Sequence, residues 1–196
     1  MNTMKRITGI LLGMIIISSL TFSVSFVPSK PQISFAASNI ENFMNMTEEQ
    51  RVQSAKNMTE EDKHIVINEF SKQNSTVNEN MTDDTINNIN SLMGNFVGAG
   101  DGFHNVEGVA KVIPLSDMKT FLRVENLKAT NGPDLYVYLS TDVNTSDITN
   151  LGRLKGNIGN QNYEIPTGTD LSKYDTVLIW CKAFSTLLGS ARLSSQ

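Results

Sequence analysis

Few side chains in this sequence have reactive chemistry. Cys181 is the only cysteine, and His104 is one of two histidines and the only one in the second half of the chain. A cysteine thiol can act as a redox group or bind a metal or haem iron, and histidine often serves beside it. A lone cysteine cannot form a disulfide within its own chain. Cys181 is therefore a packed thiol, a redox thiol, a cofactor ligand or one half of an intermolecular bridge.

The sequence around Cys181 favours burial. Residues 176–184, Thr-Val-Leu-Ile-Trp-Cys-Lys-Ala-Phe, form an apolar run that also holds the only tryptophan, and we expect a strand over 177–184. Both faces of this strand are apolar, which is typical of a strand covered on both sides. Burial in apolar surroundings raises the pKa of a thiol and lowers its reactivity. This pattern favours packing, with a redox thiol or a cofactor ligand as the alternatives.

His104 follows a glycine-rich turn at residues 98–102, so we expect it in a loop at the rim of a domain. It is either a loop histidine bonded to backbone or, with Cys181, a candidate ligand of haem or a metal, with Met118 as a weaker third ligand. The sequence does not identify the group, and the absence of any group is equally open. No CxxCH motif is present, which excludes covalent c-type haem.

The sequence shows no residue pattern typical of other catalytic sites. A zinc site needs three or four ligands at recognisable spacing, and no such cluster appears in the sequence. No nucleophile elbow is present either, so hydrolysis is not indicated. The net charge of −4 excludes nucleic acid as a partner, because phosphate binding requires a basic footprint. Whether the protein is an enzyme is left undecided by these observations.

The N-terminus has the features of an export signal. Two basic residues precede an apolar run from Ile7 to Leu20, and Ser-Phe-Ala at 34–36 fits a cleavage site. We therefore expect a signal over residues 1–36 of the kind found in Gram-positive bacteria, and a secreted or cell-envelope location outside the cytoplasm. The apolar stretch extends to Val27, which is long enough to span a bilayer, so an uncleaved membrane anchor is the alternative.

Residues 37–95 predict a helical segment. The pattern Asn-Met-Thr followed by two acidic residues occurs at 45–49, 57–61 and 80–84. Threonine is a favourable N-cap, and acidic residues favour the first turn of a helix. The pattern therefore predicts short helices near 47–56, 59–72 and 82–93, the first with a capping box between Thr47 and Gln50.

This segment is the most acidic part of the chain, with ten acidic and four basic residues, and it has few large apolar side chains. Such a composition builds little core of its own. It predicts a solvated spacer between the export signal and a folded domain. The alternative is a small helical interaction module.

From Gly94 onwards, short alternating runs are separated by turn residues, which is typical of strands. We expect strands at 106–113, 120–125, 134–140, 162–165, 177–184 and 191–193. Asn131 and Asp134 are turn formers at a tight turn. Roughly seven short strands in about 100 residues predict a β-sandwich or a partly closed barrel.

Five stretches in this region, in order, resemble the DM13 domain family. They are residues 102–108 (GFHNVEG), 131–139 (NGPDLYVYL), 151–163 (LGRLKGNIGNQNY), 177–184 (VLIWCKAF) and 189–193 (GSARL). The resemblance covers about residues 96–194. It implies an all-β domain of exported or cell-surface proteins and a proposed role in extracellular electron transfer. It also implies that the cysteine, here Cys181, acts as a bare thiol or as a ligand to a group such as haem.

The expected architecture is therefore an all-β sandwich (96–194) preceded by a short helical segment (37–95) and a signal sequence (1–36). The leading functional prediction is a redox or electron-transfer accessory at the cell surface that uses Cys181. Its partner would be an unidentified redox protein or envelope component. The alternative is a non-catalytic cell-envelope binding or adhesion module in which Cys181 only packs.

Overall fold

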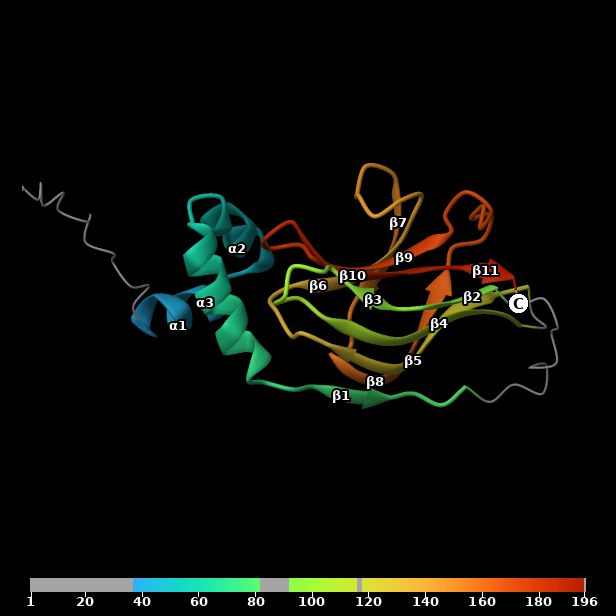
Figure 1. Ribbon diagram of the computed structural model, residues 1–196, viewed down its shortest axis with the longest axis horizontal. Coiled ribbons are helices and arrows are strands. Elements are labelled where there is room, and N and C mark those ends of the chain that lie inside the picture. Colours follow the sequence, from blue (N-terminus) through green and yellow to red (C-terminus); the bar gives the residue numbers. More distant parts are fainter. Residues whose placement is uncertain (1–36, 82–91, 116–117, 196) are drawn as a thin grey trace, which may run out of the picture. The chain divides into compact units, whose positions relative to one another are not determined.

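The computed structural model describes residues 37–81, 92–115 and 118–195 (Figure 1). The predicted export signal at 1–36 lies outside the described residues, and so does most of the predicted helix at 82–93. Its last two residues, Leu92 and Met93, belong to a strand instead, so that part of the helix prediction is wrong. Within the described ranges, no helix has both the length and the apolar character needed to cross a bilayer.

Three helices occupy the first part of the described chain: α1 (Ala37–Met44), α2 (Glu48–Ala55) and α3 (Glu60–Ser71). The last two confirm the predictions. Thr47 and Thr59 each accept a hydrogen bond from the third helical residue, whose side chain bonds back, so both helices begin with a capping box. α1 was not predicted because it lacks this start and has no acidic residue in its first turn.

Eleven strands form two sheets in the described residues. The first sheet has the order β1-β8-β5-β4-β2-β11, and the second has the order β3-β10-β9-β6-β7. The strands are β1 (Thr76–Asn78), β2 (Leu92–Asn95), β3 (Val97–Gly98), β4 (Val106–Pro114), β5 (Thr120–Ala129), β6 (Leu135–Ser140), β7 (Ile148–Arg153), β8 (Ile158–Ile165), β9 (Thr176–Cys181), β10 (Thr186–Arg192) and β11 (Ser194–Ser195).

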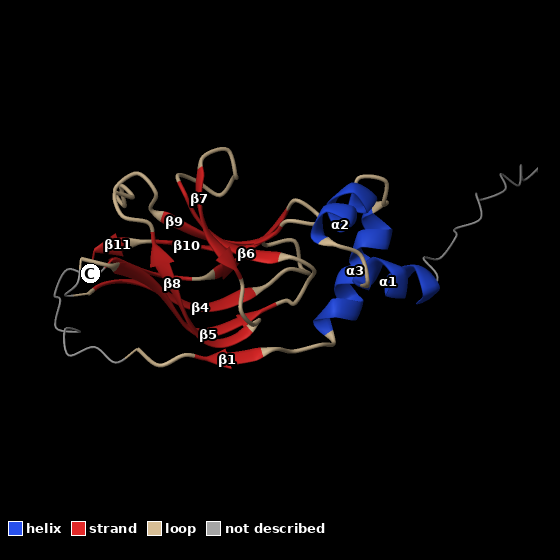
Figure 2. Cartoon of the chain, turned by 180° about the vertical axis from the view of Figure 1, so that it is seen from behind, coloured by secondary structure: helices blue, strands red, loops and turns tan. Residues whose placement is uncertain are grey.

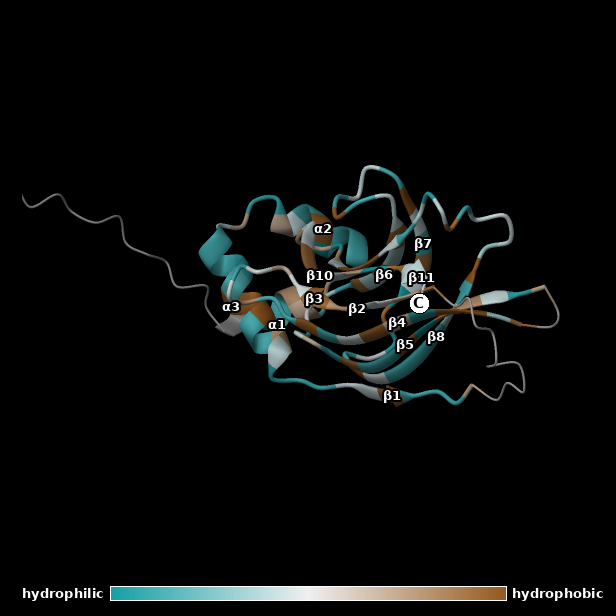
Figure 3. Ribbon diagram, turned by 45° about the vertical axis from the view of Figure 1, so that its right-hand side comes forward, coloured by the Kyte–Doolittle hydropathy of each residue, from teal (hydrophilic) through white to brown (hydrophobic). Residues whose placement is uncertain are grey.

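The two sheets bury one hydrophobic core, which confirms the predicted all-β sandwich. Figure 3 shows apolar residues recurring along the strands between hydrophilic ones. β9 is central in its sheet, and Val177, Leu178 and Ile179 are completely buried, so both of its faces are covered as expected. The short strands β1, β3 and β11 have no alternating pattern that could predict them.

β9 ends at Cys181, three residues before the predicted end. The backbone N–H of Lys182 donates to the carbonyl of Asp134, one further rung in the same register, before the chain leaves the sheet. Ser185 then adopts a φ of 52°, which turns the chain into β10. The cysteine is therefore the last residue of its strand, at the end of the sandwich where the chain reverses.

The helices gather at this same end of the sandwich (Figures 1 and 2). From α3 the chain runs along the edge of the first sheet as β1, parallel to β8. We call residues 74–80 the strap. Gly159 of β8 has a φ of 111°, and a Cβ added there would lie 2.2 Å from the carbonyl oxygen of Val77. The strap therefore approaches β8 at a point where only glycine fits.

We predict that Gly159→Ala displaces the strap. Gly152→Ala is the matched control, since Gly152 has a φ of 116° but open space around its missing Cβ. The free energy of unfolding should fall by about 1–3 kcal/mol more for Gly159→Ala, because overpacking adds to a backbone strain that both variants share. Urea unfolding measures the difference. Equal losses in the two variants would show that the close approach of the strap has no energetic weight.

Candidate functional site

Cys181 is enclosed beneath the turn that joins β5 to β6. Its residue is 1% exposed, and its thiol donates a hydrogen bond to the carbonyl of Pro133 with an Sγ–O distance of 3.0 Å. A Cβ on Gly132 would lie 4.0 Å from the sulfur. The backbone of residues 131–134 therefore covers the thiol, and we call these residues the covering turn.

The electrostatic surroundings keep this thiol protonated. The pKa of Cys181 is raised to about 12. Burial is the largest cause and the nearby Asp134 carboxylate adds to it, against the backbone hydrogen bonds with Phe184 and Ala183, which lower the pKa. The thiolate is the nucleophile, the metal ligand and the reactive form of cysteine. In this geometry Cys181 is a protected thiol, which confirms the predicted burial and leaves its function as a prediction.

Next to the thiol lies a buried carboxylate, Asp134, whose side chain is 0% exposed. Arg51 of α2 binds both of its oxygens in a fork, with Nε–Oδ2 and Nη2–Oδ1 distances of 2.6 Å. Arg153 at the end of β7 donates a further hydrogen bond to Oδ1. The hydrogen bond to Asp134 raises the pKa of Arg51, so this ion pair stays charged.

Glu48, one turn before Arg51 on the same face of α2, also binds the sandwich. It accepts hydrogen bonds from Arg153, from Lys182 and from the hydroxyl of Tyr136, the last at 2.8 Å. Burial alone would raise the pKa of Glu48, but these three donors outweigh it and hold the pKa at about 2. α2 thus carries an acid and a base that each meet opposite charges on the sandwich.

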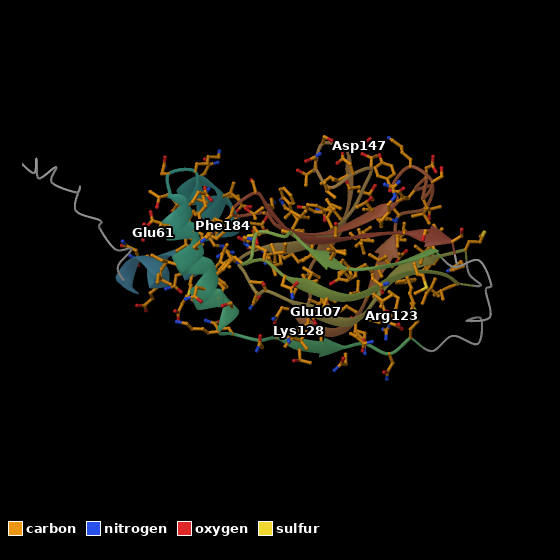
Figure 4. The ribbon with its side chains drawn as sticks, in the orientation of Figure 1. Glu61, Glu107, Arg123, Lys128, Asp147 and Phe184 are labelled. Atoms are coloured by element: carbon orange, nitrogen blue, oxygen red, sulfur yellow. The ribbon has the colours of Figure 1, made fainter. Side chains whose placement is uncertain are left out.

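The other two helices contact neighbouring loops through aromatic rings. Phe43 of α1 stacks on Phe184, just after β9, with ring centroids 5.6 Å apart. Figure 4 labels Phe184 at the end of the sandwich next to the helices. His64 of α3 stacks on Phe103 in the loop between β3 and β4, at 4.9 Å. We call residues 37–72 the helical cap, because its three helices contact the three loops at one end of the sandwich.

The cap also shares the hydrophobic core of the sandwich through Phe43, Ala55, Val66 and Ile67, all buried. Its helices and the strands belong to one compact unit. The segment expected to be a solvated spacer therefore has a buried face, although the proposed division of the chain at residue 95 stays a prediction.

His104 is buried, at 6% exposure, although we expected it at a rim. Its Nδ1 lies 2.5 Å from Oδ2 of Asp101, while the backbone N–H groups of Phe103 and His104 donate to Oδ1. Burial raises the pKa of Asp101, but these hydrogen bonds outweigh it and hold the pKa at about 2. The other ring nitrogen, Nε2, is buried and has no hydrogen-bond partner among the described residues.

This arrangement fits a single imidazole ligand. Metal-binding histidines commonly donate their second ring N–H to a carboxylate, which orients the free nitrogen toward the metal. Asp101 supplies that carboxylate here, and sequence reasoning missed it. An aspartate three residues before the histidine, in a glycine-rich loop, was the available signal.

The structure does not bring His104 and Cys181 to one cavity. A depression beside His104 is lined by Gly98, Gly100, Gly102, Phe103 and Asn105. A separate cleft of about 290 Å³ is lined mainly by Arg51, the covering turn and residues 153–157. Met118, the weaker ligand candidate, is 91% exposed between β4 and β5. The part of the chain that the structure describes has no group of three His, Cys, Asp or Glu residues suited to a metal ion.

Because Cys181 does not line the depression beside His104, a haem or metal held jointly by the two side chains does not fit the conformation seen. Cys181 directs its thiol to a backbone carbonyl, and His104 alone has an unused ligand atom. Joint ligation therefore stays a prediction that requires rearrangement of the covering turn.

Comparison with known proteins identifies the family of the β-sandwich. The family model described as "Electron transfer DM13" matches residues 96–193. No curated protein and no solved structure matches the chain. The matched residues include Cys181, His104 and Asp134, and they exclude the helical cap and the strap.

We predict that Arg51→Ala lowers the free energy of unfolding by about 3 kcal/mol, because it leaves a buried carboxylate without its main partner. The control is Arg192→Ala, which removes an ion pair to Asp175 from a side chain that is 77% exposed. That variant should lose at most about 1 kcal/mol. Denaturant unfolding compares the two. Losses of similar size would contradict the assignment of Arg51 as an anchor of the cap.

We also predict an acid-dependent contribution from Glu48. Its pKa in the folded protein is about 2, below the ordinary value of 4.5, so its contribution to stability is complete above pH 4.5 and is lost as the pH falls towards 2. The stability gap between the wild type and Glu48→Gln should shrink over that range by on the order of 1 kcal/mol, a value reduced for solvent screening. Glu60→Gln, which removes an exposed pair with Lys63, should show little such change. A gap that is constant with pH would contradict the prediction.

Proposed function

The chain belongs to the DM13 family, and we propose on that premise that it is an electron-transfer protein of the cell surface in which Cys181 is the redox-active group. The observation that carries the proposal is that the only cysteine lies within the family match, enclosed at the end of a central strand. The family description supplies the general redox role. The lone thiol supplies the group, since an exported cysteine without a partner in the chain is free for redox chemistry.

The enclosed geometry restricts how Cys181 can act. A thiol whose pKa is raised to about 12 is protonated at neutral pH, and the protonated form is the unreactive one. Electron exchange therefore requires a state in which Cys181 loses its proton or becomes a ligand. His104, with Nε2 unpartnered, is the second residue that we propose for ligation of a group such as haem. When bound, such a group would supply the one-electron chemistry.

We propose a location outside the cytoplasm because the first 36 residues have the composition of an export signal. The protein is then secreted or held at the cell envelope, and an uncleaved N-terminus would anchor it to the membrane. Its partner would be a redox protein or another envelope component. The charge distribution supports no role with nucleic acid.

A second candidate function has its own support. Burial and the raised pKa of Cys181 are also what an inert core thiol shows. On this reading the protein is a non-catalytic binding or adhesion module of the cell envelope, and Cys181 contributes only to packing.

Spectroscopy and thiol titration separate the two functions. If Cys181 is redox-active, the purified protein either shows a Soret band or reduces a one-electron acceptor such as ferricyanide, and Cys181→Ala abolishes the signal. His104→Ala should remove a Soret band if this residue is a ligand, and it should leave reduction by a bare thiol intact. A colourless protein that reduces no acceptor, and whose thiol reacts only after unfolding, would refute the redox role.

The stability of Cys181→Ser gives a further expected outcome. The substitution should lower the free energy of unfolding by about 1–3 kcal/mol, because it buries a more polar group in the same site. Cys181→Ala is the matched control, because it removes the sulfur without adding a hydroxyl. If both variants are as stable as the wild type, the thiol is neither packed nor enclosed as the structure shows.

A further inference from the structure

We propose that the helical cap is an autoinhibitory lid, which closes the Cys181 end of the sandwich and must open before this end can take part in electron transfer. The purpose of the lid rests on the function proposed above, although opening of the lid can be measured whether or not the protein transfers electrons. The cap lies outside the family match at 96–193, so it is an addition to the electron-transfer unit. It is also placed over the end of the sandwich that holds both candidate residues.

Each contact of the cap holds a loop that encloses one of these residues. Arg51 binds Asp134, the neighbour of the carbonyl group that accepts the thiol hydrogen bond of Cys181. Phe43 stacks on Phe184, three residues after Cys181. His64 stacks on Phe103, whose ring also meets the edge of the His104 ring. Lifting the cap would therefore release all three loops together.

The chemistry of the contact allows the cap to separate from the sandwich. Glu48 and Arg51 each find their opposite charges on the sandwich, at Arg153, Lys182 and Asp134. Charged groups regain hydration when such a contact opens, which a purely apolar core cannot do. The pairing also gives the closed state a defined register, because Glu48 meets Arg153 and Lys182 while Arg51 meets Asp134.

The strap keeps the cap attached while it moves. Beyond α3, backbone pairing joins Thr76–Asn78 to β8, and Glu79 adds hydrogen bonds with Arg123 and Lys155. The glycine at 159 permits the close approach that this pairing needs. A hinge at residues 72–73, between the end of α3 and the strap, would let the helices lift as a unit once the side chain of Asn131 releases the carbonyl of Gln73. The lid then recloses as an intramolecular event.

Alkylation of Cys181 by iodoacetamide tests the lid in the intact chain. The test variant is Glu48→Ala with Arg51→Ala, which removes both charges that hold α2. The matched control is Glu69→Ala with Lys72→Ala, which removes an acid and a base that pair within α3 and are both exposed. Loss of buried charged hydrogen bonds should speed alkylation of the test variant by roughly ten- to a hundredfold over the control.

The dependence of alkylation on urea tells lid opening from unfolding of the whole domain. Opening of the cap exposes less surface than unfolding of the whole domain, so the alkylation rate should rise with urea less steeply than global unfolding predicts. Hydrogen exchange should show amides of α2 and α3 opening together, ahead of those of β9. If alkylation follows global unfolding in every variant, or if test and control agree within about twofold, the lid is overturned.

Two further results keep the proposal distinct from the redox role. Should the double variant fail to fold by circular dichroism, Phe43→Ala replaces it, since that change truncates a fully buried side chain of the cap, removes its stacking on Phe184 and is expected to speed alkylation in the same way. Fast alkylation of an opened variant that reduces no acceptor supports the lid and refutes the redox role of Cys181. Slow alkylation of an active protein refutes the lid alone.

Discussion

The buried carboxylate of Asp134 constrains the whole end of the sandwich at which Cys181 lies. A charge removed from water must be paired within the protein, and a partner lost from such a pair costs several kcal/mol. Arg51 and Arg153 supply the pairing from α2 and from the end of β7. The backbone carbonyl of Asp134 accepts from Lys182, immediately after the end of β9. One residue thus joins the cap, both neighbouring strands and the covering turn above the thiol.

The local parts of this architecture follow from sequence, whereas the long-range parts do not. The Thr47 capping box and the apolar pattern of residues 134–140 are short-range signals, and the helix and strand that they predict are confirmed. Asp134 has the appearance of an ordinary turn former, because its charge partner Arg51 is 83 residues away in sequence. No periodicity records such a pair. For the same reason, the cap has the composition of a spacer although one face of it is buried.

The candidate site shows the same division. The apolar run at residues 176–184 is enough to predict that Cys181 is buried, and family resemblance is enough to predict a redox class. Neither shows that a backbone carbonyl accepts the thiol hydrogen bond, because that depends on where the covering turn lies. His104 has a buried imidazole and an aspartate partner that glycine-rich loops rarely suggest. The hydrogen-bond partners of Cys181 and His104 are brought close by the turns of the folded chain.

The position of the cap at the start of the chain has a consequence for folding order. Glu48 and Lys182 are bonded across 134 residues, so the cap has no complete docking surface until β9 and the turn after it exist. Contacts of such high sequence separation form late, since their loop-closure entropy must be met first. The capping boxes favour formation of α2 and α3 as local structure before the cap docks on the sandwich. Docking of the cap over the Cys181 end of the sandwich is therefore expected to be a late step of folding.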